Sequence, residues 1–148
     1  MKTDAEAIFE VEQAFASCQR PQRFTDYWLC DECAEHNETL ARHTPQTITL
    51  KELGNVGWDP ICFATPEAFQ YYLPALSRLA IAEIEGNYLM QFLFHVNDDR
   101  RYQCLSASQR RCLFRFLSHI SEAYPEYTKA HFIEDDLAAA LLKYKGSE

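Results

Sequence analysis

Apolar side chains recur every three or four positions along most of the chain, which is the spacing that places residues on one face of an α-helix. The first such run follows Thr3 and Glu6, which have the spacing of a capping box, and it predicts a helix over 4–17. Pro21 closes this segment, because a proline cannot supply a helical hydrogen-bond donor. The apolar face consists of Ile8, Val11, Phe15 and Cys18.

A longer helix is predicted to begin at Thr65, whose hydroxyl can cap it, with Pro66 at the first helical position. Pro74 falls inside the apolar pattern of this helix. Because a proline removes a backbone donor and clashes with the carbonyl four residues earlier, we expect a kink or a break near Leu73. The apolar face consists of Phe69, Tyr72, Leu73, Leu76 and Leu79.

The same pattern predicts several shorter helices, and it leaves 48–53 open between a short strand and a helical turn. These helices span 31–41, 88–96 and 135–144, and one more begins at the capping pair Ser106 and Gln109 and ends at Pro125. The sequence therefore predicts a mainly α fold of about five to six helices, with room for one small β element.

The composition fits one compact globular domain over residues 1–148. Hydrophobic residues make up 47% of the chain, well above the level of chains that stay disordered. Only four glycines and no internal repeat are present, so nothing indicates a second domain. The amino terminus resembles no secretory leader, and no apolar run is long enough for a bilayer, so we expect a cytoplasmic protein with no membrane partner.

The formal net charge is −8, from 22 acidic and 14 basic side chains. Binding to nucleic acid or to anionic lipid depends on cationic side chains, so this charge disfavours both. Acidic residues are concentrated in 1–67, whereas five arginines follow one another with no acid between them. These are Arg100, Arg101, Arg110, Arg111 and Arg115, which we expect to pair with Asp98, Asp99 or carboxyl-terminal acids. A basic protein is the partner that the overall charge favours.

Six cysteines without an export signal are expected to be reduced thiols. Three of them lie in or beside apolar runs and are predicted to be buried structural thiols, namely Cys18, Cys62 and Cys112.

The most specific local motif is Cys30-x-x-Cys33-x-x-His36, with His43 seven residues further on. Thiolates and imidazoles at short spacing are typical ligands of tetrahedral zinc, so these four residues are candidate ligands of a structural zinc ion. Seven residues of straight helix separate side chains by about 10 Å along the axis, so His43 can join only if the helix ends before it. Other candidates for the fourth ligand are Cys62, Cys104 and His131.

Two other interpretations of this motif stay open. In the first interpretation, Cys30 and Cys33 are free thiols, of which one is packed against other residues and the other is partly exposed. His36 then lies in solvent. In the second they form a redox pair of the thioredoxin type. The absence of a βαβ pattern opposes this second interpretation, as do Asp31 and Glu32, whose charges disfavour a thiolate. A catalytic zinc is disfavoured because no HExxH pattern supplies a general base.

The run from Gly57 to Phe63, GWDPICF, and the run from Pro66 to Leu76, PEAFQYYLPAL, resemble an uncharacterised family of small bacterial proteins. The segment from Cys30 to His36 resembles a pattern in some of its members. The resemblance implies a bacterial cytosolic protein, and it transfers no activity and no catalytic residue.

The remaining polar residues within apolar segments are interpreted as structural. In Trp58-Asp59-Pro60 we expect a buried tryptophan and an aspartate that caps a turn. The histidines His95, His119 and His131 lie on or beside apolar helices and are expected to be satisfied structural residues.

The sequence contains no recognisable catalytic set, so it favours a non-catalytic, protein-binding or regulatory module over an enzyme. Its size, acidity and 14% aromatic content are typical of inhibitor or immunity proteins that face a basic partner. The alternatives are a zinc-dependent enzyme and a thiol oxidoreductase, both built on Cys30, Cys33 and His36.

Overall fold

Helices form nearly all the regular structure in the computed structural model, which describes residues 1–146. The α-helices are α1 (Asp4–Ala14), α2 (Asp31–Ala41), α3 (Leu50–Leu53), α4 (Pro66–Ile81), α5 (Tyr88–Val96), α6 (Asp99–Cys104), α7 (Ala107–Ala123), α8 (Pro125–Ala130) and α9 (Glu134–Lys145). Three 3-10 helices join them: η1 (Val56–Trp58), η2 (Pro60–Phe63) and η3 (Ile84–Gly86). Across 1–146, β structure is limited to one antiparallel bridge between Thr25 and Ala64. The mainly α prediction is confirmed, with more helices than predicted.

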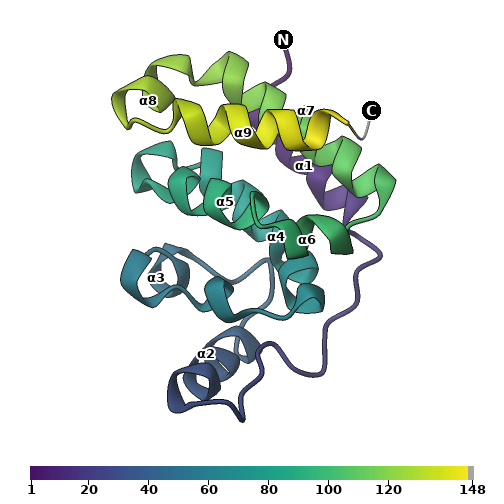
Figure 1. Ribbon diagram of the computed structural model, residues 1–148, viewed down its shortest axis with the longest axis vertical. Helices are drawn as coiled ribbons and strands as arrows, with labels where there is room; N and C mark the ends of the chain where they lie inside the picture. The colour runs from purple at the N-terminus through teal and green to yellow at the C-terminus, as the bar shows by residue number, and fades with distance from the viewer. Residues whose placement is uncertain (147–148) are drawn as a thin grey trace.

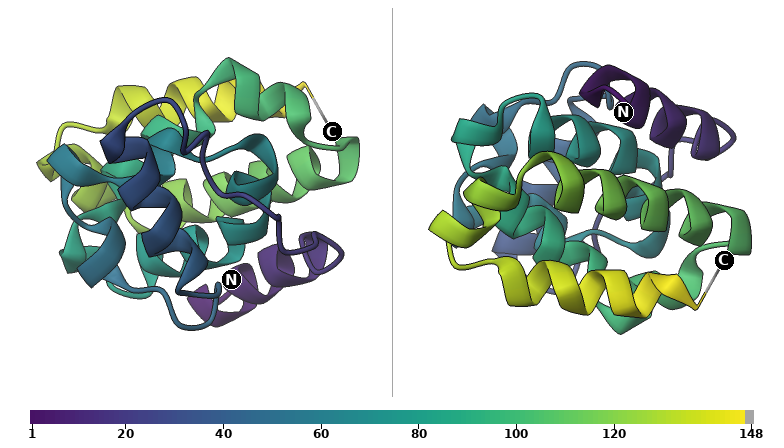
Figure 2. Two further views of the ribbon diagram at one scale, coloured as in Figure 1. Left: turned by 90° about the horizontal axis from the view of Figure 1, so that it is seen from below. Right: turned by 90° about the horizontal axis from the view of Figure 1, so that it is seen from above.

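The helices lie in three tiers in the view of Figure 1, and the amino terminus and the end of α9 lie at the top. The upper tier holds α1, α7, α8 and α9, and Figure 2 shows α7 between α1 and α9. The middle tier holds α4, α5 and α6. A long segment then runs down one side from α1 to the lower tier, which consists of α2, α3 and the short helices η1 and η2.

The core lies where α4 and α5 pack against each other and against the upper tier. Tyr72, Leu73 and Leu76 of α4 are fully buried, as the apolar pattern predicts. From α5, Phe92 meets Phe116 of α7 in an edge-to-face contact, with 5.5 Å between ring centroids. Such aromatic pairs add stability beyond the area they bury.

Helix starts agree closely with the capping signals in the sequence. Thr3 and Ser106 each form the predicted capping box, and the Thr65 hydroxyl caps α4. A third capping box, at Thr49, opens α3, so 48–53 contains a helical turn and not a strand. Helix α7 ends at Ala123, just before Pro125 as predicted, and Pro125 itself occupies the first position of α8, where a proline is tolerated.

Of the kink or break predicted near Leu73, the break is wrong, because α4 continues through Pro74 from Pro66 to Ile81, and the kink stays a prediction. The surrounding residues are almost all buried, and their packing holds the helix together across the missing hydrogen bond. Across residues 1–146, no helix is both long and apolar enough to span a membrane.

Candidate functional site

The first turn of α2 brings two thiols together. Cys30 is the N-cap residue, with extended backbone angles of φ −167° and ψ 169°, and its Sγ accepts a hydrogen bond of 3.3 Å from the amide of Cys33. The two Sγ atoms lie 2.9 Å apart. Cys30 is exposed, whereas Cys33 is buried and its carbonyl accepts a 2.6 Å hydrogen bond from the hydroxyl of Thr25.

The two thiols have opposite electrostatic surroundings. Hydrogen bonds from the side chain and the amide of Cys33 lower the pKa of Cys30, and they outweigh the opposing charge of Glu32. The pKa of Cys33 is raised by its hydrogen bond to Cys30 and by burial. Acidic neighbours therefore do disfavour a thiolate, as expected from the sequence, but at Cys30 they are the weaker influence.

His36 lies one turn further along α2. It is buried, not in solvent as the free-thiol interpretation expected. Its ring lies between those of Trp58 and Phe63, with centroid distances of 4.6 and 4.9 Å. The Nε2 atom lies 3.2 Å from a carboxylate oxygen of Glu32, and the buried Nδ1 atom has no hydrogen-bond partner in the described part of the chain.

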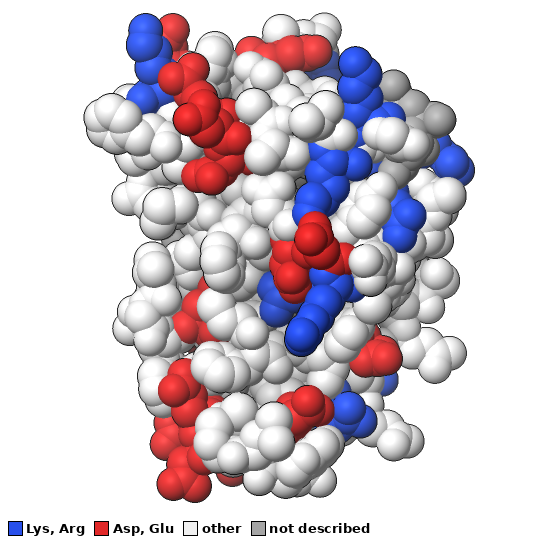
Figure 3. All heavy atoms as spheres, in the orientation of Figure 1, with Lys and Arg blue, Asp and Glu red and all other residues white. Residues whose placement is uncertain are grey.

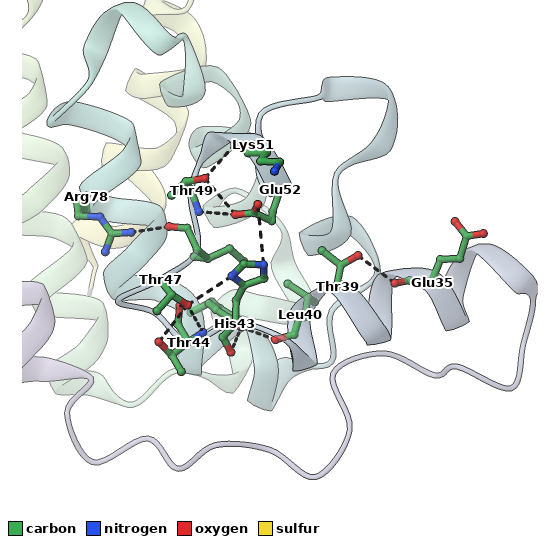
Figure 4. Close-up of polar contacts among 12 residues, drawn as sticks. Glu35, Thr39, Leu40, His43, Thr44, Thr47, Thr49, Lys51, Glu52 and Arg78 are labelled. Atoms are coloured by element: carbon green, nitrogen blue, oxygen red, sulfur yellow. Dashed lines mark hydrogen bonds and ion pairs between the residues drawn. The ribbon is translucent and has the colours of Figure 1, made fainter.

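His43 lies beyond the end of α2, which does stop before it, at Ala41. Figure 4 shows its ring directed at Thr47 and Glu52, with Nδ1 3.4 Å from the Thr47 hydroxyl and Nε2 3.9 Å from the Glu52 carboxylate. His43 is thus engaged away from the thiols.

The four predicted zinc ligands are consequently not assembled around one point. Within 1–146, three or more ligand-type atoms come within 4.8 Å of one another only at Asp59, Cys62 and His95. Zinc binding by Cys30, Cys33, His36 and His43 stays a prediction.

The group around Asp59 is a buried hydrogen-bond network that joins η2 to α5 and α6. One carboxylate oxygen of Asp59 accepts from the amide of Ile61 at 2.9 Å and so caps η2, as predicted. The other accepts from Gln91 at 2.9 Å and from Nε2 of His95 at 2.7 Å. Arg101 donates to Nδ1 of His95 at 2.7 Å.

This arrangement fixes the protonation of His95. Because Arg101 can only donate, Nδ1 of His95 must accept, and the ring proton lies on Nε2, facing the carboxylate of Asp59. Burial lowers the pKa of His95, and the nearby charge of Arg101 lowers it further, against the opposing effect of Asp59. His95 is therefore a neutral bridge between a buried cation and a buried anion.

The same arrangement disfavours both metal and nucleophile chemistry at Cys62. A histidine that binds a metal normally donates its second ring proton to an acceptor, whereas the second ring nitrogen of His95 receives a proton from Arg101. Both ring nitrogens are occupied, so His95 is not positioned as a base for Cys62, and burial and Asp59 raise the pKa of that thiol.

Two sequence expectations are wrong in this region. Cys62 is exposed and is not a buried structural thiol, whereas Cys112 is buried and Cys18 is partly buried. Trp58 is 41% exposed and lies over His36. Cys62 and Arg101 border an open pocket of about 550 Å³ whose wall also includes Met90, Phe94, Asn97, Asp98 and Asp136.

The histidine and arginine predictions are partly confirmed. His95 is satisfied on both nitrogens, and His119 lies 2.7 Å from the carboxylate of Asp4. His131 is exposed and stacks on Tyr127, and its Nδ1 lies 3.0 Å from the carbonyl oxygen of Tyr127. Of the five arginines, Arg101 lies 3.8 Å from Asp98 as expected. Arg110 instead binds the carbonyls of Tyr102 and Gln103, and Arg115 pairs with Glu10.

Large apolar side chains next to the thiol pair are exposed to solvent. Tyr27, Trp28 and Leu29, which directly precede Cys30, are 50%, 61% and 67% exposed. Figure 3 shows acidic side chains gathered at the lower end of the molecule, where α2 lies. Of the α2 acids, Asp31, Glu35 and Glu38 are exposed and form no ion pair within 1–146.

We call Tyr27, Trp28 and Leu29, together with Asp31, Glu35 and Glu38, the α2 surface. The sequence shows the aromatic run and the acids, but no periodicity indicates that the run stays outside the core. The network at Asp59 was likewise missed, because its members come from segments more than 30 residues apart.

Comparisons of the chain with models of protein families, with curated protein sequences and with solved structures found no match. The resemblance to an uncharacterised bacterial family therefore stays a prediction.

Proposed function

We propose that this protein is a non-catalytic protein-binding module that holds a basic segment of a partner protein on the α2 surface. The observation that carries the proposal is the exposure of Tyr27, Trp28 and Leu29, three consecutive large side chains that are half or more in solvent. Aromatic side chains in such positions are typical anchors of protein interfaces.

The charges of the α2 surface indicate the chemistry of the partner. Asp31, Glu35 and Glu38 pair with no cation among the described residues 1–146, so lysine or arginine side chains of a partner can pair with them without breaking a contact seen there. The ring of Trp28 already accepts a cation, because the guanidinium of Arg23 lies 5.3 Å from its centroid. An arginine flanked by apolar residues is the kind of segment that fits this surface.

The test compares purified wild-type protein with Trp28→Ser and Leu142→Ser as baits in native lysate. Leu142 is the matched control, because it is 77% exposed and lies on α9, in the upper tier. We expect a basic protein to be retained by the wild type and by Leu142→Ser, and to be lost with Trp28→Ser. The purified partner should then bind the wild type directly, with an affinity that falls at least tenfold between low and physiological salt.

A partner that binds all three proteins equally would contradict this function, as would an acidic partner or affinity independent of salt. Circular dichroism would establish that Trp28→Ser remains helical, which its exposure predicts. A zinc-dependent enzyme receives no specific support from the geometry.

A further inference from the structure

We propose that Cys30 and Cys33 form a redox-active thiol pair that exchanges with disulfides, preferentially cationic ones. The exchange chemistry does not rest on the binding function proposed above, because it requires only the two sulfurs and their immediate surroundings, although Asp31 belongs to both sites. Cys30 is the attacking thiol and Cys33 the resolving thiol.

The two sulfur atoms of the pair lie close together. The Sγ atoms are 2.9 Å apart, closer than two sulfur atoms in ordinary van der Waals contact. A disulfide bond is about 2.04 Å long, so the sulfurs need to approach by only about 0.9 Å more to be joined. Cys30 is the N-cap of α2 and Cys33 lies in its first turn, so one local segment of the chain positions both sulfurs.

The two thiols differ in how easily an external disulfide can reach them. Cys30 lies at the exposed start of the helix, where an external disulfide can reach it, whereas Cys33 is only 7% exposed. Cys33 is also held in place through its carbonyl, which accepts the hydrogen bond from Thr25. A reachable sulfur beside a fixed, enclosed one is the arrangement that two-step exchange needs.

Thiol–disulfide exchange at this pair takes two steps. The Cys30 thiolate attacks one sulfur of a disulfide RS–SR, forming a mixed disulfide and releasing RS⁻. Cys33 then loses its proton and attacks the sulfur of Cys30, which forms the Cys30–Cys33 disulfide and releases the second RS⁻. The two thiol protons pass to the two released thiolates. The protein pair is oxidised by two electrons, and the external disulfide is reduced to two thiols.

The surroundings support this order of events. Hydrogen bonding from Cys33 lowers the pKa of Cys30, which favours its thiolate. The hydrogen bond to Cys30 is the largest cause that raises the pKa of Cys33. A mixed disulfide at Cys30 removes this cause, so Cys33 becomes easier to ionise when it is required to attack.

The charge around the pair selects among disulfides. Asp26 and Glu32 act on these thiols, and exposed Asp31 adjoins Cys30. This negative field repels an anionic disulfide such as glutathione disulfide and attracts a cationic one such as cystamine. We therefore expect cystamine to oxidise the pair at least threefold faster at low salt, with the ratio approaching one as salt is raised.

The experiment follows the oxidation by mass spectrometry. Reduced protein is treated with cystamine or glutathione disulfide, quenched in acid, alkylated and digested with trypsin. Cleavage after Arg23 and Arg42 releases the peptide 24–42, which contains Cys30 and Cys33 and no other cysteine. We expect this peptide to become two hydrogens lighter and to resist alkylation before the other cysteines react.

Two variants separate the roles of the thiols. Cys33→Ser should stop at a mixed disulfide on Cys30, whereas Cys30→Ser should leave Cys33 unreacted. Serine is a preferred N-cap residue, so Cys30→Ser preserves the start of α2. Cys104→Ser is the control, because Cys104 is also exposed, and this variant should leave the oxidation of 24–42 unchanged.

Each contrary result overturns a definite part of the proposal. If Cys30 in Cys33→Ser reacts no faster than Cys104, Cys30 is not an attacking thiol. If 24–42 carries two external thiols instead of an internal disulfide, the pair does not close. Stoichiometric zinc that blocks both thiols until a chelator is added would show that they are metal ligands, and equal rates with both disulfides would remove the charge preference.

Discussion

Two groups of residues stand out in this protein: the proposed thiol pair, with Cys30 exposed and Cys33 buried, and the buried hydrogen-bond network around Asp59. Asp59 and Arg101 are 3% and 8% exposed, and leaving either charge without a partner would cost several kcal/mol. The neutral ring of His95 relays between them, so each charge has a hydrogen-bonded neighbour. This network fixes η2 against α5 and leaves no free base, which is why the reactive chemistry is assigned to α2.

The protonation of His95 leads to a prediction about pH. Because the folded pKa of His95 lies below the ordinary value of about 6.5, the unfolded chain binds more protons than the folded protein once the pH falls below 6.5. The contribution of neutral His95 to the stability of the folded protein is complete above pH 6.5. It is lost as the pH falls toward the pKa that His95 has in the folded protein. We expect up to about 1.4 kcal/mol lower stability per pH unit from this residue in that window.

Nuclear magnetic resonance tests this directly. The ring carbon-bound protons of His95 should titrate at lower pH than those of an unstructured histidine peptide, because the folded pKa of His95 is lowered. In urea unfolding between pH 7.5 and 5.5, His95→Gln should lose less stability per pH unit than the wild type. A His95 resonance that titrates at or above 6.5 would contradict the assignment.

At the scale of elements, Pro74 destabilises α4, and the packing of this helix compensates for the loss. An interior proline destabilises a helix by about 3 kcal/mol, while its rigidity in the unfolded chain returns up to about 1 kcal/mol. Pro74→Ala restores a backbone donor for the carbonyl of Gln70 but removes a half-buried ring. We therefore expect a net stabilisation of about 1–2 kcal/mol, measured by urea unfolding.

Pro66→Ala in the same helix is the matched control, and it should have the opposite sign. Pro66 occupies the first helical position, where no donor is needed, so its replacement should lower stability by about 0.5–1 kcal/mol through the unfolded state. If both replacements destabilise the protein equally, Pro74 contributes packing that exceeds its helix-breaking effect.

The elements also show what the sequence can predict. Helix α2 spans Asp31–Ala41 and α5 spans Tyr88–Val96, both as predicted, because Pro45 follows the first segment and Gly86 and Asn87 precede the second. By contrast, α6 and α8 have six residues each, too few for a period to emerge, and packing against larger helices stabilises them.

The candidate site was predictable only in part, for a related physical reason. The spacing of Cys30 and Cys33 reveals that the two thiols share a helical turn, since this is a local property. The orientation of His36 depends on Trp58 and Phe63, which come from a different segment, so the sequence spacing suggested a convergence with the thiols that the fold does not make.

Over the whole molecule, the lower tier is joined to the middle tier by hydrogen bonds to its backbone carbonyls. Arg78 of α4 donates at 2.8 Å to the carbonyls of both Pro45 and Ile48. The hydroxyl of Tyr72, also of α4, donates to the carbonyl of Leu40 at 2.5 Å, and the carbonyl of His43 lies 2.9 Å from the same hydroxyl oxygen. The helices of the lower tier are short and pack mainly on one another, whereas α7 packs along both α1 and α9, so we infer that the lower tier opens before the upper tier does.

Arg78→Ala tests this inference by native-state hydrogen exchange. Losing charged hydrogen bonds to two carbonyls should cost about 2 kcal/mol, which corresponds to about 30-fold faster exchange for amides in 44–53. Amides in the middle of α7 should change much less, because they exchange only when the upper tier opens. Arg115→Ala is the control: Arg115 is exposed and lies 3.8 Å from Glu10, so its loss should alter exchange by less than about fivefold. Equal acceleration of α7 and 44–53 in Arg78→Ala would instead mean that the three tiers unfold as one cooperative unit.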